Sequence, residues 1–274
     1  MGTSKSFGTP KGGSWTPLKN DLTDHLRGNS AITPEHLVGR AVSAAGLGLS
    51  GLRRAGGGNT GVGGGGSGGG GRGGGGGGAR AARAVGGAVA GLAGFGSSVR
   101  AEGLDAALNR LGLPELRGRP AAEVLAALAD KLANEAEGPQ KELINASLLE
   151  VLFEAAELEG AEGYDDLSAS LQSFLEREGI DGLVESFLTK CVYDGIWFAI
   201  EEHVGMKSET NSDVKTLAGA MEAVCRAQVR AVMQQSRDAG TFEGTDWFGT
   251  EGQTAAHGIV SELERRLRDL EEPR

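Results

Sequence analysis

The sequence predicts an all-α protein: a single helical, bundle-like domain preceded by a basic arm and a glycine-rich tether. From residue 102 to the C-terminus, apolar residues recur at intervals of three and four, the spacing of one face of an α-helix. No segment of convincing length alternates apolar and polar residues as a half-buried strand does. Between Gly56 and Gly78, 18 of 23 residues are glycine. Such a tract has no side chains to bury and a high entropy cost of ordering, so it predicts a flexible tether.

The glycine tract divides the chain into three segments. We expect residues 1–54 to form a disordered basic arm, residues 55–79 a flexible linker and residues 80–274 an acidic all-helical domain. Residues 1–100 hold 11 Lys and Arg against 3 acidic residues, and residues 101–274 hold 16 against 34, so net charges of +8 and −18 sum to the −10 of the whole chain. A basic arm on an acidic body can fold back onto that body, bind an acidic partner or contact nucleic acid. The acidic body itself should repel nucleic acid.

The first 29 residues show no apolar period. Their large apolar residues Phe7, Trp15 and Leu18 stand isolated among Gly, Ser, Thr, Lys and Pro. A segment of this composition cannot bury itself, so we expect disorder until a partner binds. The three large apolar residues are then the expected anchors for that partner.

One helix is predicted on each side of the glycine tract. An N-cap threonine followed by proline predicts a short helix over residues 34–47. The Ala-rich residues 79–94 predict a weak connecting helix rather than a membrane segment. Within it, Gly87 and Gly91 lie four residues apart on one face, a spacing that lets another helix approach closely.

Apolar stripes predict the helices of the domain. They cover residues 104–111, 120–132, 143–156, 164–177, 181–204, 211–233 and 255–270. The segment 181–204 is the most apolar and should be central to the core. Asn211 or Ser212 is the expected N-cap of the helix that follows it. Cys191 and Cys225 lie inside apolar patterns and predict buried free thiols in a reducing compartment.

No pattern predicts catalysis, a cofactor or a bound metal. Residues 46–51 match G-x-G-x-x-G, but no strand precedes them and the glycine tract follows where a helix should begin. None of the four histidines has a second His or Cys at metal-ligand spacing, and His203 is expected at the surface near a helix end. Arg72 stands alone within the tract, which does not suffice for an RNA-binding segment. We expect a non-enzymatic protein.

The extreme N-terminus has a more specific pattern. Removal of Met1 would expose the α-amine of Gly2, the least hindered nucleophile that a protein terminus offers. Residues 1–6 also fit the N-myristoylation pattern, but a single acyl chain gives only marginal membrane binding. With neither a secretory signal nor a run of roughly 20 apolar residues, the chain is expected to be cytoplasmic and to have no membrane partner.

Three parts of the sequence resemble the QatB family of the bacterial Qat anti-phage defence system. They are the opening Met1–Ser4 with its Gly, Pro, Ser and Trp-containing continuation, the glycine-rich middle, and the helical segments Leu104–Leu113 and Gly118–Val124. The resemblance implies companions: an ATPase, QatA; a protein similar to 7-cyano-7-deazaguanine synthase, QatC; and a TatD-like nuclease, QatD.

The resemblance also implies a role for the N-terminus. The helical body would dock on the QatC-like partner, while Gly2, Thr3 and Ser4 enter that partner's nucleotide-dependent site as a protein substrate. Gly2 is the expected modified residue, through a 7-deazaguanine group; if the tail is first trimmed, Gly12 or Gly13 takes its place. A purely structural adaptor and, less favoured, a nucleic-acid sensor acting through the basic arm remain alternatives.

Overall fold

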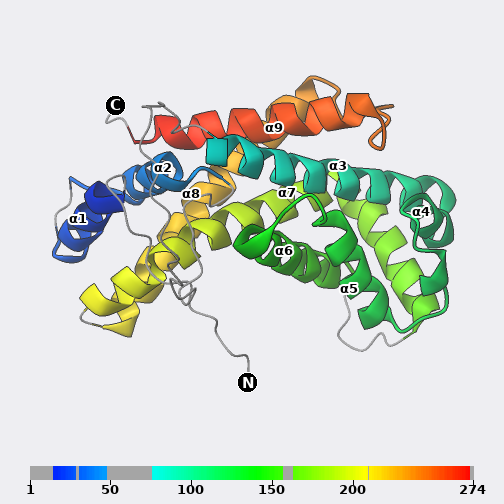
Figure 1. Ribbon diagram of the computed structural model, residues 1–274, viewed down its shortest axis with the longest axis horizontal. Helices are drawn as coiled ribbons and strands as arrows, with labels where there is room; N and C mark the ends of the chain where they lie inside the picture. Colours follow the sequence, from blue (N-terminus) through cyan, green and yellow to red (C-terminus); the bar gives the residue numbers. More distant parts are fainter. Residues whose placement is uncertain (1–14, 29–30, 48–75, 157–162, 209, 272–274) are drawn as a thin grey trace, which may run out of the picture.

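The computed structural model of the chain describes residues 15–28, 31–47, 76–156, 163–208 and 210–271, with side chains from residue 82 onward in the third range. Within these ranges the secondary structure is helical and contains no strand, which confirms the predicted all-α class. Figure 1 shows the elements: α1 (Trp15–Leu26), α2 (Pro34–Ala45), α3 (Gly76–Glu102), α4 (Leu104–Arg110), the 3₁₀ turn η1 (Pro114–Leu116), α5 (Ala121–Leu132), α6 (Gly138–Ala156), α7 (Tyr164–Lys207), α8 (Asn211–Asp238) and α9 (Thr250–Asp269).

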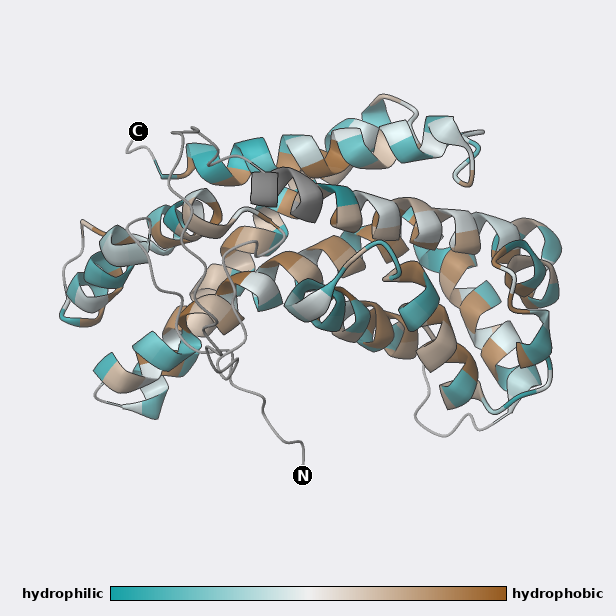
Figure 2. Cartoon of the chain, viewed as in Figure 1, coloured by the Kyte–Doolittle hydropathy of each residue, from teal (hydrophilic) through white to brown (hydrophobic). Residues whose placement is uncertain are grey.

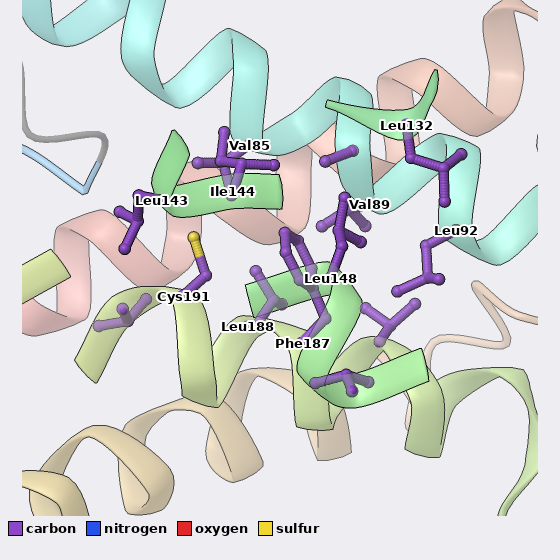
Figure 3. Close-up of a cluster of buried hydrophobic side chains, with 14 of the residues drawn as sticks. Val85, Val89, Leu92, Leu132, Leu143, Ile144, Leu148, Phe187, Leu188 and Cys191 are labelled. Carbon is purple, nitrogen blue, oxygen red and sulfur yellow. The ribbon is translucent and has the colours of Figure 1, made fainter. Parts of the chain in front are cut away.

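Helices α3 and α7 form the centre of the structure. Helix α7 packs against α6, α3 and α8 and also contacts α1 and α2, while α3 packs against α9, α4 and α5. In Figure 2 the apolar faces of these helices turn towards one another. Figure 3 shows where α3, α5, α6 and α7 meet, in a cluster that includes Val85, Val89, Leu92, Leu132, Leu143, Ile144, Leu148, Phe187, Leu188 and Cys191.

Helix α7 joins two predicted helices. The segments 164–177 and 181–204 were expected as separate helices, and they follow one another directly with non-helical backbone at Gly179, where φ is +74°. Glycine adopts this left-handed conformation at little cost, whereas a residue with a Cβ atom does not. The predicted break is therefore a bend between two halves of one long element.

Helix α3 corrects the prediction of a weak connecting helix over residues 79–94. Its side chains at Val85, Val89 and Leu92 are at most 1 % exposed, so this helix is part of the core. The predicted close approach at its glycines is confirmed. A Cβ atom would lie 2.3 Å from a carboxylate oxygen of Glu135 at Gly87 and 2.7 Å from Leu132 at Gly91. Small residues here let the end of α5 lie against α3.

Residues 15–26 and 34–45 belong to the packed body, which differs from the expected arm over residues 1–54. Helix α1 contacts α2 and α7, and α2 contacts α8 and α9. A few large apolar side chains with no extended pattern suffice, because the body supplies the surface that buries them. Residues 1–14 and 48–75, with most of the predicted linker, lie outside the described residues.

The prediction of the N-cap is confirmed for α2 and wrong for α8. Thr33 is the N-cap of α2, and its side chain accepts a hydrogen bond from the backbone N–H of His36 at 3.3 Å. The cap of α8 is Thr210 rather than Asn211 or Ser212. Thr210 and Asp213 form a reciprocal capping box, which satisfies two backbone donors.

A polar junction joins α1 and α2 to the residues that follow α9. Arg40 pairs with Asp21 at 3.1 Å and with Glu271 at 2.8 Å. His36 bridges the same two elements, with Nε2 3.2 Å from Asp21 Oδ2 and Nδ1 3.0 Å from the backbone oxygen of Glu271. Gly39 permits this contact, because a Cβ atom there would lie 2.4 Å from the backbone nitrogen of Glu271.

We predict that Gly39→Ala destabilises the protein by about 1–3 kcal/mol, because the methyl group meets backbone that can yield only by moving α2 away from the C-terminal segment. Gly258→Ala is the matched control, since nothing lies within 4 Å of its added Cβ atom. It should stabilise α9 by roughly 0.5–1 kcal/mol through helix propensity. Urea unfolding of both variants checks this, and shifts in the same direction would contradict the packing at Gly39.

Candidate partner-binding site

The predicted N-terminal site is only partly within the described residues. The predicted modification and anchor positions outside them are Gly2, Thr3, Ser4, Phe7, Gly12 and Gly13. Trp15 and Leu18 are described, and they are 3 % and 0 % exposed. Both side chains are buried against their own chain. They therefore hold α1 to the body and are not exposed anchors for a partner, which corrects the prediction for these two residues.

His203 of α7 connects α7 to α1 through a hydrogen bond. Its Nε2 atom lies 3.0 Å from the carbonyl oxygen of Lys19 and 3.1 Å from Thr23 Oγ1. Burial lowers the pKa of His203 below its ordinary value, so the neutral ring donates its Nε2 proton to the Lys19 carbonyl. The expected surface histidine is thus a buried contact between α1 and α7, which is a correction.

A cavity of about 540 Å³ lies between α1 and the end of α7. Its charged lining residues are Lys19, Arg27 and Lys207 against Asp24. With His203 neutral, these side chains carry a net charge of +2. This cavity is the positively charged surface next to the point where the chain enters α1.

A second cavity, which we call the α6–α8 groove, lies between α6, α7 and α8 and has a volume of about 450 Å³. Helix α6 supplies Glu150 and Glu154, α7 supplies Glu185, Lys190 and Tyr193, and α8 supplies Glu222, Arg226 and Arg230. All three helices pack through their apolar faces, so these charged residues are the ones that remain along the edges of the packed faces. The groove is polar and built from residues far apart in the sequence.

Ion pairs hold the three cations of the groove. Lys190 Nζ lies 2.6 Å from Glu150 Oε1 and 3.7 Å from Asp194 Oδ1. On α8, Arg226 pairs with Glu222 at 2.6 Å.

Arg230 pairs with Glu185 at 3.4 Å, and Glu185 also pairs with Arg237, whose charge is balanced by Asp181. Counting the four glutamates of the lining against its three cations, the groove carries a net charge of −1, and Asp194, which pairs with Lys190, lies beside it. Of these four glutamates, Glu154 is exposed at the rim.

Burial and neighbouring charges shift the pKa of three residues at the groove. Burial and the nearby Glu150 and Glu222 raise the pKa of Asp194 to about 6, despite the opposing effect of Lys190. The pKa of Lys190 is also raised, because its hydrogen bond to Glu150 and the charge of Asp194 outweigh burial, which acts the other way. Burial, Glu222 and Asp194 raise the pKa of Tyr193.

The two cysteines lie beside the groove but are not accessible from it. Cys191 and Cys225 are free and buried, as predicted. Burial raises the pKa of each thiol to about 12, so both remain protonated at neutral pH. They act as small apolar core residues.

The described residues contain neither a metal-binding cluster nor a membrane-spanning helix. No three or more His, Cys, Asp or Glu side chains in those ranges lie in a group that could hold a metal ion. In the same ranges, no helix is both long enough and apolar enough to cross a membrane.

Comparison with known proteins identifies a family. The family model described as QatB, Qat anti-phage system associated protein, matches residues 73–246. The match therefore covers α3 to α8 and the whole α6–α8 groove, and it does not include α1, α2 or α9. No curated protein and no solved structure matches the chain.

We predict that Leu18→Ala loosens α1 from the body. Removing a fully buried leucine side chain costs about 2–5 kcal/mol of packing, and α1 has few other core contacts to replace it. Hydrogen exchange should accelerate over residues 15–26 much more than over α3 or α7. Asn20→Ala, on the exposed face of the same helix, is the control and should leave exchange unchanged. Uniform acceleration in both variants would argue against a separately held α1.

We predict that Asp194→Asn becomes more favourable to stability as pH rises. The pKa of Asp194 in the folded state, about 6, lies above its ordinary value of 3.8, so the folded state favours the protonated carboxyl. The protein therefore loses stability as Asp194 ionises, and this loss is absent only below about pH 4. An asparagine stays neutral, so the variant should gain about 2–3 kcal/mol on the parent between pH 4 and pH 7. Urea unfolding across this range measures the difference.

The control for this experiment is Asp166→Asn, at an exposed position in the first turn of α7. A carboxylate at a helix N-terminus is favourable when ionised, so this variant should not gain on the parent as pH rises. Equal pH profiles for Asp194→Asn and the parent would contradict the raised pKa.

Proposed function

The chain belongs to the QatB family of Qat anti-phage system associated proteins, and we propose that it is a non-enzymatic component that presents its N-terminus to a QatC-like partner for modification. The helical body docks on the partner, and the fourteen residues before α1 enter the partner's active site. The companions of the system, a QatA-like ATPase and a QatD-like nuclease, are further candidate partners. Their contacts with this chain are part of the same proposal.

The observation that carries this proposal is the fixed position of α1. Trp15, Leu18 and Leu22 are buried, and the hydrogen bond from His203 holds the helix on α7. The preceding segment therefore leaves the body from a defined point. Fourteen residues span up to roughly 46–50 Å when extended, which is enough to enter the active site of a protein docked alongside.

The fixed α1 changes the role expected of the glycine tract. Helix α2 packs against α8 and α9, so the tract joins two elements of one body, α2 and α3. Its length does not set the reach of the N-terminus. The segment 1–14 sets that reach by itself.

The chemistry of the proposal requires a free amine. Removal of Met1 exposes the α-amine of Gly2, which attacks a carboxylate that the partner has activated with a nucleotide. A C–N amide bond forms, the activating group leaves with the bond electrons, and the amine loses a proton. Thr3 and Ser4 would pass through the entrance of the partner's site; if the tail is trimmed first, Gly12 or Gly13 supplies the amine.

We predict a partner-dependent mass increase on Gly2. The protein is expressed with and without its QatC-like neighbour, and intact mass and N-terminal peptides are measured by mass spectrometry. Gly2→Pro should abolish the increase, because a hindered secondary amine replaces the primary one, while the two proteins still co-purify. Deleting residues 61–70 from the glycine tract is the matched control and should leave the modification in place.

The other outcomes distinguish the alternatives. Co-purification with an unmodified N-terminus in every sample would favour a structural adaptor. Nucleic acid that co-purifies and dissociates steeply with added salt would favour a sensor, although the acidic body counts against it. Loss of modification on deleting residues 61–70 would contradict the independence of reach from the tract.

A further inference from the structure

We propose that residues 1–14 occupy the α6–α8 groove of their own chain when no partner is bound. This self-contact would hold the N-terminus against the body before a partner receives it. It does not depend on the proposed modification, because it concerns the free protein. Three properties of the groove and of the segment lead to it: charge, reach and an aromatic surface.

Charge distinguishes the two cavities as seats for the segment. Residues 1–14 contain Lys5 and Lys11 and no acidic residue, so they carry a net side-chain charge of +2, to which the free α-amine adds. Counted over the lining residues of each, the α6–α8 groove carries −1, whereas the cavity beside α1 carries +2. Coulomb interactions therefore attract the segment to the groove and repel it from the nearer cavity.

The carboxylates of the groove are placed to receive lysine side chains. Each of the three lining cations already pairs with a groove carboxylate, and the excess lies with Glu154 at the exposed rim and the half-buried Asp194 beside Lys190. Lys190 Nζ lies 2.6 Å from Glu150 but 3.7 Å from Asp194, so its positive charge is held mainly by Glu150. A lysine ammonium placed near Glu154 and Asp194 would balance the negative charge of these carboxylates.

The segment is long enough to reach the groove. Its fixed end is Trp15, the first residue of α1, four residues before Lys19, whose carbonyl accepts a hydrogen bond from His203 of α7. Tyr193, at the near end of the groove, precedes His203 by ten residues, or about 15 Å along the helix. A flexible coil of fourteen residues has an end-to-end distance of about 20 Å and a maximum near 50 Å. Attachment at this distance gives an effective concentration on the order of millimolar, so weak contacts suffice.

An aromatic side chain of the lining, Tyr193, lies at that end of the groove. Tyr193 stacks on Trp197 with ring centroids 6.2 Å apart and an interplanar angle of 17°, and both rings are half-buried. Phe7 is the single aromatic residue of segment 1–14 and lies between its two lysines. The rings therefore offer a contact for Phe7 while Lys5 and Lys11 lie among the carboxylates.

Photo-crosslinking of the full chain without a partner tests the proposal. Phe7 is replaced by p-benzoylphenylalanine, and the crosslinked peptides are identified by mass spectrometry in a mixture of isotope-labelled and unlabelled protein. We expect intramolecular crosslinks to peptides of α6, α7 and α8 that line the groove, with a yield that falls as NaCl rises from roughly 50 to 500 mM. Crosslinks confined to other surfaces, crosslinks between chains, or none at all would overturn the proposal.

A pair of charge reversals on α6 separates groove binding from general attraction to an acidic body. Glu154→Lys, in the groove, should lower the yield of groove crosslinks several-fold. Glu142→Lys makes the same charge change at an exposed position of α6 outside the groove and should leave the yield unchanged. Equal yields in both variants would contradict the proposal. Because no partner is present, failure here is distinguishable from failure of the N-terminal modification.

Discussion

The bend at Gly179 is the constraint on which the arrangement of the helices depends. A straight helix of the 44 residues of α7 would extend about 66 Å, too far for both of its apolar ends to reach one core. The positive φ of Gly179 turns the chain, so Leu175 before the bend and Leu183 after it both lie within 4 Å of the position that a Cβ atom of Gly96 in α3 would occupy. One side of α3 thus receives both halves of α7. The remaining helices pack on this pair.

The glycine tract separates regions of different composition but not regions of different structure. Helices of twelve residues such as α1 and α2 are marginal in water alone, and their composition gives little evidence of a core. They are stable because the body offers apolar surface to Trp15 and Leu18 and hydrogen-bonding groups at His203 and Glu271. Local composition describes residues 15–45 as an arm because these tertiary contacts leave no trace in it.

The sequence predicted the elements better than the site. Apolar periodicity placed the core helices, including the break within α7, because burial of one helix face requires that spacing. It underestimated α3, where glycines bring α5 close and the apolar residues between them are buried. The groove was not predicted. When each of α6, α7 and α8 is considered alone, the face that lines the groove has the composition of an ordinary solvent-exposed face. Of the ion pairs at the groove, only Lys190–Asp194 and Glu222–Arg226 join residues at i,i+4 spacing, which the sequence alone shows.

The proposed self-contact and the proposed partner contact would use one surface for two purposes. A partner that recognised only the N-terminal segment would have to compete with the groove for that segment. Because groove and segment belong to one chain, the groove is present at an effective concentration on the order of millimolar. A partner that docked at the groove would displace the segment by occupying its seat, and the released N-terminus would already be next to that partner. The groove lies wholly within the residues shared with the QatB family, whereas α1 does not. Recognition through the groove would therefore couple docking to release of the N-terminus, and the short tail would need little sequence specificity of its own.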